Sequence, residues 1–315
     1  ALNGAGYWAI ISQLVFFQFL RFVLLIKNKE FEIMKPSINM DVMKLYFKGL
    51  SSSLNNYITF FQLYGGTLLI SYLYSPEKLA YYLKASGLKS LPTTYICMVL
   101  TDIMISSLAA ININKNKEEF EKRYHMALFK VALIACPLSA FLFPLSSEAV
   151  MFFYGKNWSP SVVLLEWMSI VGVMLPLSTS VIWLYISTGN YKHQLKVNVF
   201  ITIISLFIYG FVCSQFLSYK NVILSEVFIY SILIPVVTVF HSHRILGIDV
   251  NKTLIIFIPI LVFSIFSGYL LSIIEVWNVN YILSSFIKLL VGFLIYIPLC
   301  YVFFRNNFVK EVLKW

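Results

Sequence analysis

Residues 254–274 read LIIFIPILVFSIFSGYLLSII, a run of 21 residues without a charged side chain. At a helical rise of 1.5 Å per residue this run is about 32 Å long, close to the roughly 30 Å hydrocarbon core of a bilayer. Similar runs recur along the chain at near-regular intervals. The sequence therefore predicts an all-α integral membrane protein whose main solvent is lipid.

The overall composition supports this prediction. Of the 315 residues, 59% are hydrophobic and 12% are charged, whereas about a quarter of residues are charged in soluble domains. The four cysteines each lie in an apolar run without paired spacing, which favours packing residues over disulfides or a zinc site. The net charge of +10 comes from short segments between the runs, so we expect no nucleic-acid partner.

We expect nine transmembrane helices, which we place at residues 7–26, 49–74, 89–110, 125–145, 162–187, 197–215, 222–240, 254–274 and 281–304. Two helix starts are marked by a serine followed by a proline, at Ser75-Pro76 and Ser159-Pro160. Serine is a preferred N-cap and proline suits the first helical position, so we expect helices to begin at these two prolines.

The distribution of Lys and Arg predicts the orientation. The segments after the odd-numbered spans hold 16 of these residues, against 5 on the other side. By the positive-inside rule the first terminus lies outside and the C-terminus is cytoplasmic. An odd number of spans with an outside start is unusual for a complete protein, and the chain begins with Ala1 instead of Met. We therefore expect a fragment of a longer protein.

Ionisable groups inside a bilayer are costly, which makes them the first candidates for function. The segment from Pro76 to Ile111 would be about 54 Å long as one helix, so it must tilt, extend outward or kink, and Pro92 predicts a kink. Lys84 and Asp102 are 18 residues, or five turns, apart, and Tyr95 falls near the same face. These residues either line a cavity, or Lys84 snorkels and Asp102 caps or pairs locally.

Other ionisable groups in the spans give weaker predictions. Lys130 lies about 9 Å into its span, where it either contacts an anionic substrate or snorkels to the interface. For Lys288, Glu166 and Glu226 we favour snorkelling or local pairing. The sequence contains no nucleotide-binding or metalloprotease motif, and His241 and His243 have no third metal ligand nearby in the sequence. We expect a transporter without a cofactor rather than an enzyme.

Several local patterns resemble one known family, the Wzx-type polysaccharide flippases of the multidrug/oligosaccharidyl-lipid/polysaccharide flippase superfamily. The matching elements occur in the family's order and at similar spacing. They are GYWA at 6–9 with QL at 13–14, LAYY at 79–82 with LP at 91–92, FYGKNWSPS at 153–161, and TGN at 188–190.

The resemblance implies the last nine spans of a fourteen-helix, two-lobe transporter. In that alignment residues 1–30 are the last helix of the N-terminal lobe, 31–48 a cytoplasmic connector, 49–242 the six-helix C-terminal lobe, and 250–315 two additional helices with a cytoplasmic tail. The chain departs from the family pattern in carrying Gly66-Thr67 where related members often have Asp-Asn, and Lys84 where Arg is common.

The resemblance also implies a function. A flippase of this kind moves polyprenyl-pyrophosphate-linked oligosaccharides across the bacterial inner membrane for O-antigen, capsule or exopolysaccharide synthesis. A polysaccharide polymerase and a chain-length regulator would be partners. We expect Lys84, Lys89, Lys130 and Tyr95 to bind substrate and Asp102 to couple transport to a proton or sodium gradient.

Three alternatives remain open from the sequence. One is a cation-coupled drug or metabolite antiporter of the same superfamily. Another is a membrane polymerase or glycosyltransferase, although such an enzyme should carry a large outer loop with Arg-rich elements, whereas the longest expected outer loops here have only about 15 residues and no Arg. A scaffold without transport activity is the third.

Overall fold

The computed structural model describes residues 8–27, 39–215, 218–274 and 281–305. The chain divides into two compact units, residues 1–49 and 50–315. The first unit contains α1 (Trp8–Lys27) and the beginning of α2 (Met40–Leu73), which continues into the second unit. Much of the predicted connector lies outside the described residues, and its last part already belongs to α2. The predicted cytoplasmic tail after Arg305 also lies outside them.

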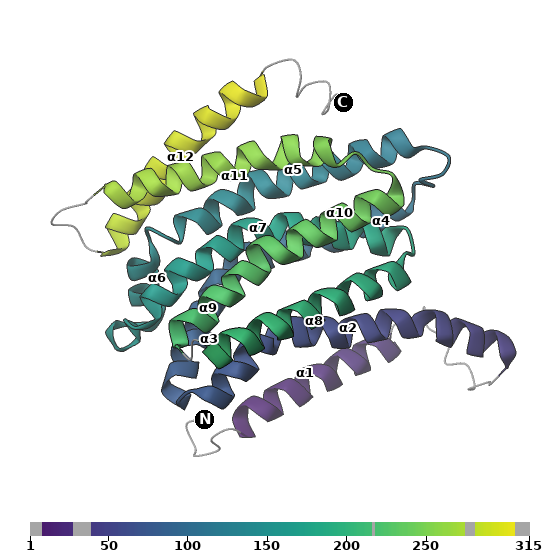
Figure 1. Cartoon of the computed structure of the whole chain (residues 1–315), viewed down its shortest axis with the longest axis horizontal. Helices are drawn as coiled ribbons and strands as arrows, with labels where there is room; N and C mark the ends of the chain where they lie inside the picture. Colours follow the sequence, from purple (N-terminus) through teal and green to yellow (C-terminus); the bar gives the residue numbers. More distant parts are fainter. Residues whose placement is uncertain (1–7, 28–38, 216–217, 275–280, 306–315) are drawn as a thin grey trace. The chain divides into compact units, whose positions relative to one another are not determined.

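The second unit is built from helices alone in its described parts (Figure 1). After α2 the order is α3 (Pro76–Thr93), η1 (Thr94–Met98), α4 (Val99–Ala109), α5 (Lys117–Phe141), α6 (Ser146–Tyr154), η2 (Lys156–Trp158), α7 (Ser161–Ser187), α8 (Tyr191–Gln215), α9 (Tyr219–Phe228), η3 (Ile229–Leu233), α10 (Ile234–Leu246), α11 (Val250–Ile273) and α12 (Tyr281–Arg305). The elements η1 and η3 are π-helical, and η2 is a 3-10 turn.

Seven helices of the described chain are long and apolar enough to cross a membrane. They are Pro76–Ala109, Lys117–Phe141, Ser161–Ser187, Tyr191–Gln215, Tyr219–Leu246, Val250–Ile273 and Ile282–Arg305. The prediction of an all-α, multi-pass membrane protein is confirmed. The number nine stays a prediction, because the two remaining predicted spans correspond to α1 and to part of α2, which are not among the seven.

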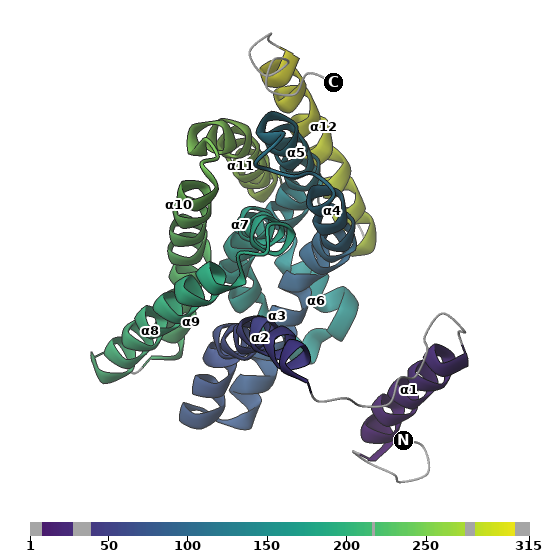
Figure 2. The ribbon, with the colours of Figure 1, turned by 90° about the vertical axis from the view of Figure 1, so that its right-hand side faces the viewer.

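Helix α7 packs against α3, α4, α5 and α10, and Figure 2 shows it near the middle of the second unit. Small residues allow this close approach. A Cβ atom added at Gly172 would lie 3.0 Å from the Ser139 side chain of α5 and 3.7 Å from the backbone oxygen of Lys89 in α3. In a bilayer, where lipid tails are as apolar as side chains, such close packing is what holds helices together.

Helix α11 packs lengthwise on α5, and α12 packs on α11 and α6. At Gly268 of α11 an added Cβ would lie only 3.0 Å from the backbone oxygen of Ala140 in α5. The two last helices therefore belong to the same compact unit as the helices before them. The finer domain boundaries at 242 and 250 stay predictions.

Two spans are interrupted by π-helical turns next to prolines. The turn η1 begins two residues after Pro92, close to the place where the sequence predicts a kink, and η3 precedes Pro235 of α10. Proline lacks the backbone N–H that an α-helix needs, so the ladder of hydrogen bonds is rearranged nearby. Wider turns of this kind are frequent at functional sites.

The helix starts follow the predicted chemistry closely. Helix α3 begins at Pro76, as predicted, with the Ser75 hydroxyl 3.4 Å from the backbone nitrogen of Lys78. The prediction for the other proline is wrong by one residue, since α7 begins at Ser161 and Pro160 is its N-cap. The preceding 3-10 turn η2 extends to Trp158 and leaves Pro160 in the turn between the two elements.

The contact of Gly268 with α5 gives a testable prediction for stability. Gly268→Ala places a methyl group against backbone, which cannot rotate away, so we expect a loss of about 1–3 kcal/mol in the free energy of unfolding. SDS-induced unfolding of the purified protein in mixed micelles measures this change. Gly210→Ala in α8 is the control, because an added Cβ there meets nothing within 4 Å. Equal stability of the two variants would contradict the close packing of α5 and α11.

Candidate functional site

A buried ion pair joins α3 to α9 inside the second unit. Glu226 of α9 is only 3% exposed, and its carboxylate accepts a hydrogen bond of 2.7 Å from the Tyr82 hydroxyl of α3. The Lys89 Nζ atom, also on α3, lies 3.5 Å from the other carboxylate oxygen. A charge placed away from water needs such partners, because its desolvation costs several kcal/mol.

The local sequence explains why these three groups meet. Tyr82 and Lys89 are seven residues apart on α3, which is two helical turns and therefore one face. Space for the carboxylate comes from Gly66 of α2, where an added Cβ would lie 2.9 Å from Glu226 Oε2 and 3.3 Å from the Tyr82 oxygen. The missing side chain of Gly66 thus leaves the room that the Glu226 carboxylate occupies.

Tyrosines surround the ion pair. The Lys89 Nζ atom lies 5.8 Å from the ring centre of Tyr230, whose hydroxyl donates to the backbone carbonyl of Gln62 in α2. Tyr209 of α8 is buried, and its hydroxyl has no hydrogen-bond partner in the described part of the chain. Helices α2, α3, α8 and α9 and the turn η3 therefore contribute the polar groups around the Lys89–Glu226 pair.

Lys84 lies in a separate, aromatic environment. Its Nζ atom is 4.6 Å from the ring centre of Tyr154 and 5.1 Å from that of Trp158. Both rings belong to the FYGKNWSPS segment at 153–161 that carries the family resemblance. Burial raises the pKa of the Tyr154 phenol, so the ring stays neutral and can stabilise the cation through its π face.

The remaining candidates from the sequence lie at the surface of the second unit. Tyr95 in η1 is 70% exposed, and Asp102 of α4 and Lys130 of α5 are also exposed. The π-helical turn lies between Lys84 and Asp102 and changes the phase that a regular helix would keep. The structure brings Lys89 to a buried carboxylate, and it does not gather the five predicted residues into one cluster.

The structure adds Glu226, for which the sequence alone favoured snorkelling or local pairing. Its partner Lys89 is 137 positions earlier, so no spacing rule connects them. Two other ionisable groups in the spans also have polar partners. Lys288 of α12 forms an ion pair with Glu148 of α6, and Glu166 lies 3.4 Å from the Ser146 hydroxyl.

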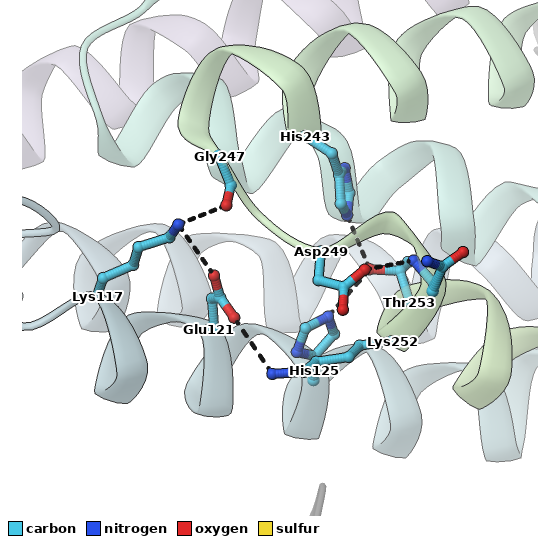
Figure 3. A network of polar contacts seen from close by, with 9 residues as sticks. Lys117, Glu121, His125, His243, Gly247, Asp249, Lys252 and Thr253 are labelled. Atoms are coloured by element: carbon cyan, nitrogen blue, oxygen red, sulfur yellow. Dashed lines mark hydrogen bonds and ion pairs between the residues drawn. The ribbon is translucent and has the colours of Figure 1, made fainter.

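A second polar network links α5, α10 and α11 (Figure 3). Glu121 of α5 lies between two lysines, with Lys117 Nζ at 3.7 Å and Lys252 Nζ at 3.9 Å. Lys117 also donates to the carbonyl oxygen of Gly247, which ends α10 with a φ of +64°. This left-handed conformation suits glycine, and it turns the chain toward Asp249, the N-cap of α11.

Beneath these charges a hydroxyl connects two buried imidazoles. His243 Nδ1 lies 2.9 Å from the Val239 carbonyl, and a carbonyl only accepts, so Nδ1 carries the proton. With a neutral ring, His243 Nε2 accepts from the Thr253 hydroxyl at 2.7 Å, and the same Thr253 oxygen lies 3.0 Å from His125 Nε2. One hydroxyl thereby joins α5, α10 and α11 (Figure 3).

The role of this hydroxyl can be tested by removing it. Thr253→Val keeps the side-chain shape but leaves two buried imidazole nitrogens without their partner, so we expect a loss of about 1–3 kcal/mol in unfolding free energy. Denaturation in mixed micelles measures the effect. Thr202→Val is the matched control, since that hydroxyl donates to the carbonyl four residues earlier in its own helix. If both variants unfold alike, the His125–Thr253–His243 chain does not hold the three helices together.

The apolar helices and the buried ion pair define a multi-pass membrane protein with a polar interior. A family model described as "Polysaccharide biosynthesis protein" matches residues 1–163, about half of the chain. The chain therefore belongs to this family of polysaccharide biosynthesis proteins. The matched segment includes Tyr82, Lys84 and Lys89, while Glu226 lies beyond it. No curated protein and no solved structure matches the chain.

Proposed function

We propose that this protein is a transporter that moves polyprenyl-pyrophosphate-linked oligosaccharides across the inner membrane for surface polysaccharide synthesis. The observation that carries the proposal is the buried Lys89–Glu226 pair in a membrane-spanning member of a polysaccharide biosynthesis family. A flippase needs no covalent chemistry and no cofactor. It needs a polar path for the sugars and a cation for the pyrophosphate.

The ion pair suits this task because the anionic substrate and Glu226 compete for one lysine. When a phosphate group binds Lys89, the carboxylate loses its counter-charge in a poorly hydrated site. Protonation of Glu226 then removes the unpaired charge, while Tyr82 keeps its hydrogen bond to the carboxyl group. Substrate binding and proton uptake would be coupled in this way. We place proton exchange at Glu226 rather than at Asp102, because Asp102 is exposed, whereas Glu226 is buried and lies beside the Lys89 cation.

The buried carboxylate also favours a second candidate, a cation-coupled antiporter of small molecules. The two candidates differ in cargo and can be separated by reconstitution. In vesicles that contain the purified protein, a flippase makes fluorescent polyprenyl-pyrophosphate oligosaccharide accessible to a glycosidase added outside. The antiporter hypothesis instead requires uptake of a small organic cation driven by a proton gradient, with no change in glycolipid accessibility. Absence of glycolipid movement in active vesicles would refute the flippase proposal.

A double-mutant cycle on the ion pair separates transport from folding. Lys89→Met leaves a buried carboxylate without its cation, and we expect it to lower the unfolding free energy by about 3–5 kcal/mol. The double variant Lys89→Met/Glu226→Gln should recover most of this loss, because both charges are gone and the amide still accepts from Tyr82.

Export of surface polysaccharide in cells lacking the native gene is the functional measurement for the same variants. We expect the double variant to be abundant but inactive, because it has neither the phosphate-binding cation nor the proton site. Normal export by a stable double variant would show that the pair is structural and would remove the main support for the proposal.

A further inference from the structure

A separate cavity of about 350 Å³ lies among the first turns of α3, α7 and α9. Three aromatic side chains line it, Tyr81, Trp167 and Tyr219, and the lysines Lys78 and Lys220 belong to the same wall. None of these residues belongs to the Lys89–Glu226 pair. The volume of the cavity falls in the range of about 300–1,000 Å³ that is typical of small-ligand pockets.

The tyrosine hydroxyls of this cavity are already engaged. The Tyr81 hydroxyl donates to the Glu77 carboxylate at 2.7 Å, and the Tyr219 hydroxyl donates to the backbone oxygen of Lys78 at 2.8 Å. Tyr81 also packs edge-on against Trp158, with ring centres 5.9 Å apart. The rings are therefore held in place, and what they offer a ligand is their apolar faces.

The two lysines are held by aromatic rings. Lys78 Nζ lies 5.8 Å from the ring centre of Tyr219, and Lys220 Nζ lies 5.8 Å from that of Trp167. In the described part of the chain neither ammonium group forms an ion pair, and both side chains are exposed. The starts of three helices add positive partial charge at the same end of the second unit (Figure 1).

We propose that this cavity binds one anionic sugar residue, such as a uronic acid. The C–H groups on one face of a pyranose carry partial positive charge and pack on the negative faces of aromatic rings. A carboxylate on the same sugar ring then pairs with Lys78 and Lys220. A phospholipid headgroup carries the charge but lacks the flat apolar face, so the three rings favour the sugar.

The site has a defined place in the predicted topology. Lys78, Pro160 and Lys220 follow spans that the charge distribution predicts to end outside the cell membrane. An anionic glycan on that side would meet the cavity after it has crossed the bilayer. Binding itself does not require that the chain moves the glycan, so this inference can hold even if the proposed transport activity fails.

Binding can be measured by saturation-transfer NMR on the purified full chain in detergent, with methyl β-glucuronide as the probe. We expect saturable binding that is at least fivefold tighter than for the neutral methyl β-glucoside. Lys78→Gln/Lys220→Gln should weaken glucuronide binding at least tenfold, while Lys156→Gln, an exposed lysine outside the cavity lining, should leave it unchanged. Equal melting temperatures of the variants show that the exposed substitutions leave the fold intact.

Two results would overturn the proposal. The first is absence of saturable glucuronide binding, or binding that is unchanged in the double lysine variant. The second result would come from nanodiscs in which phosphatidylglycerol replaces phosphatidylcholine. If glucuronide no longer binds the wild-type chain in these nanodiscs, the cavity takes a lipid headgroup instead of a sugar. Retained glucuronide binding in phosphatidylglycerol nanodiscs supports the sugar site.

Discussion

The close contact of α7 with α3 and α5 at Gly172 is the constraint on which the second unit depends. A glycine at this point lets the side chain of Ser139 and the backbone at Lys89 approach the same turn of α7. Because no water is available to drive helices together in lipid, such approach of backbones supplies much of the packing energy. It also fixes the position of Lys89, since its own backbone oxygen is one of the atoms that face Gly172.

The polar groups of the second unit fall into two kinds of environment. Where α5, α10 and α11 meet, the buried imidazoles of His125 and His243 both lie within hydrogen-bond distance of one threonine hydroxyl, that of Thr253. Around α3 and α9 the carboxylate has one lysine and one tyrosine, and the nearby Tyr209 hydroxyl has no partner among the described residues. The first region is satisfied and suits a structural role, whereas the second keeps hydrogen-bonding capacity for a ligand or a proton.

Much of the architecture could be predicted from local sequence. The apolar runs marked the spans, the proline at position 92 marked a break, and the Ser-Pro pairs located two helix starts to within one residue. The site could not be predicted in the same way. Lys84, Tyr95 and Asp102 share a face only on a regular helix, and the π-helical turn between them removes that regularity. The partner of Lys89 lies on another helix, so only the tertiary packing of α3 against α9 reveals it.

The two π-helical turns have a consequence for motion. The turn η1 begins five residues after Lys89, and η3 begins three residues after Glu226. A π turn holds one residue more than an α turn, and passing that extra residue along the helix rotates the intervening segment by about 100° without unwinding it. Lys89 and Glu226 therefore each lie close in sequence to a π-helical turn that can shift the register of the helix. A small axial slip of either helix would rotate Lys89 or Glu226 away from the other residue and break the ion pair.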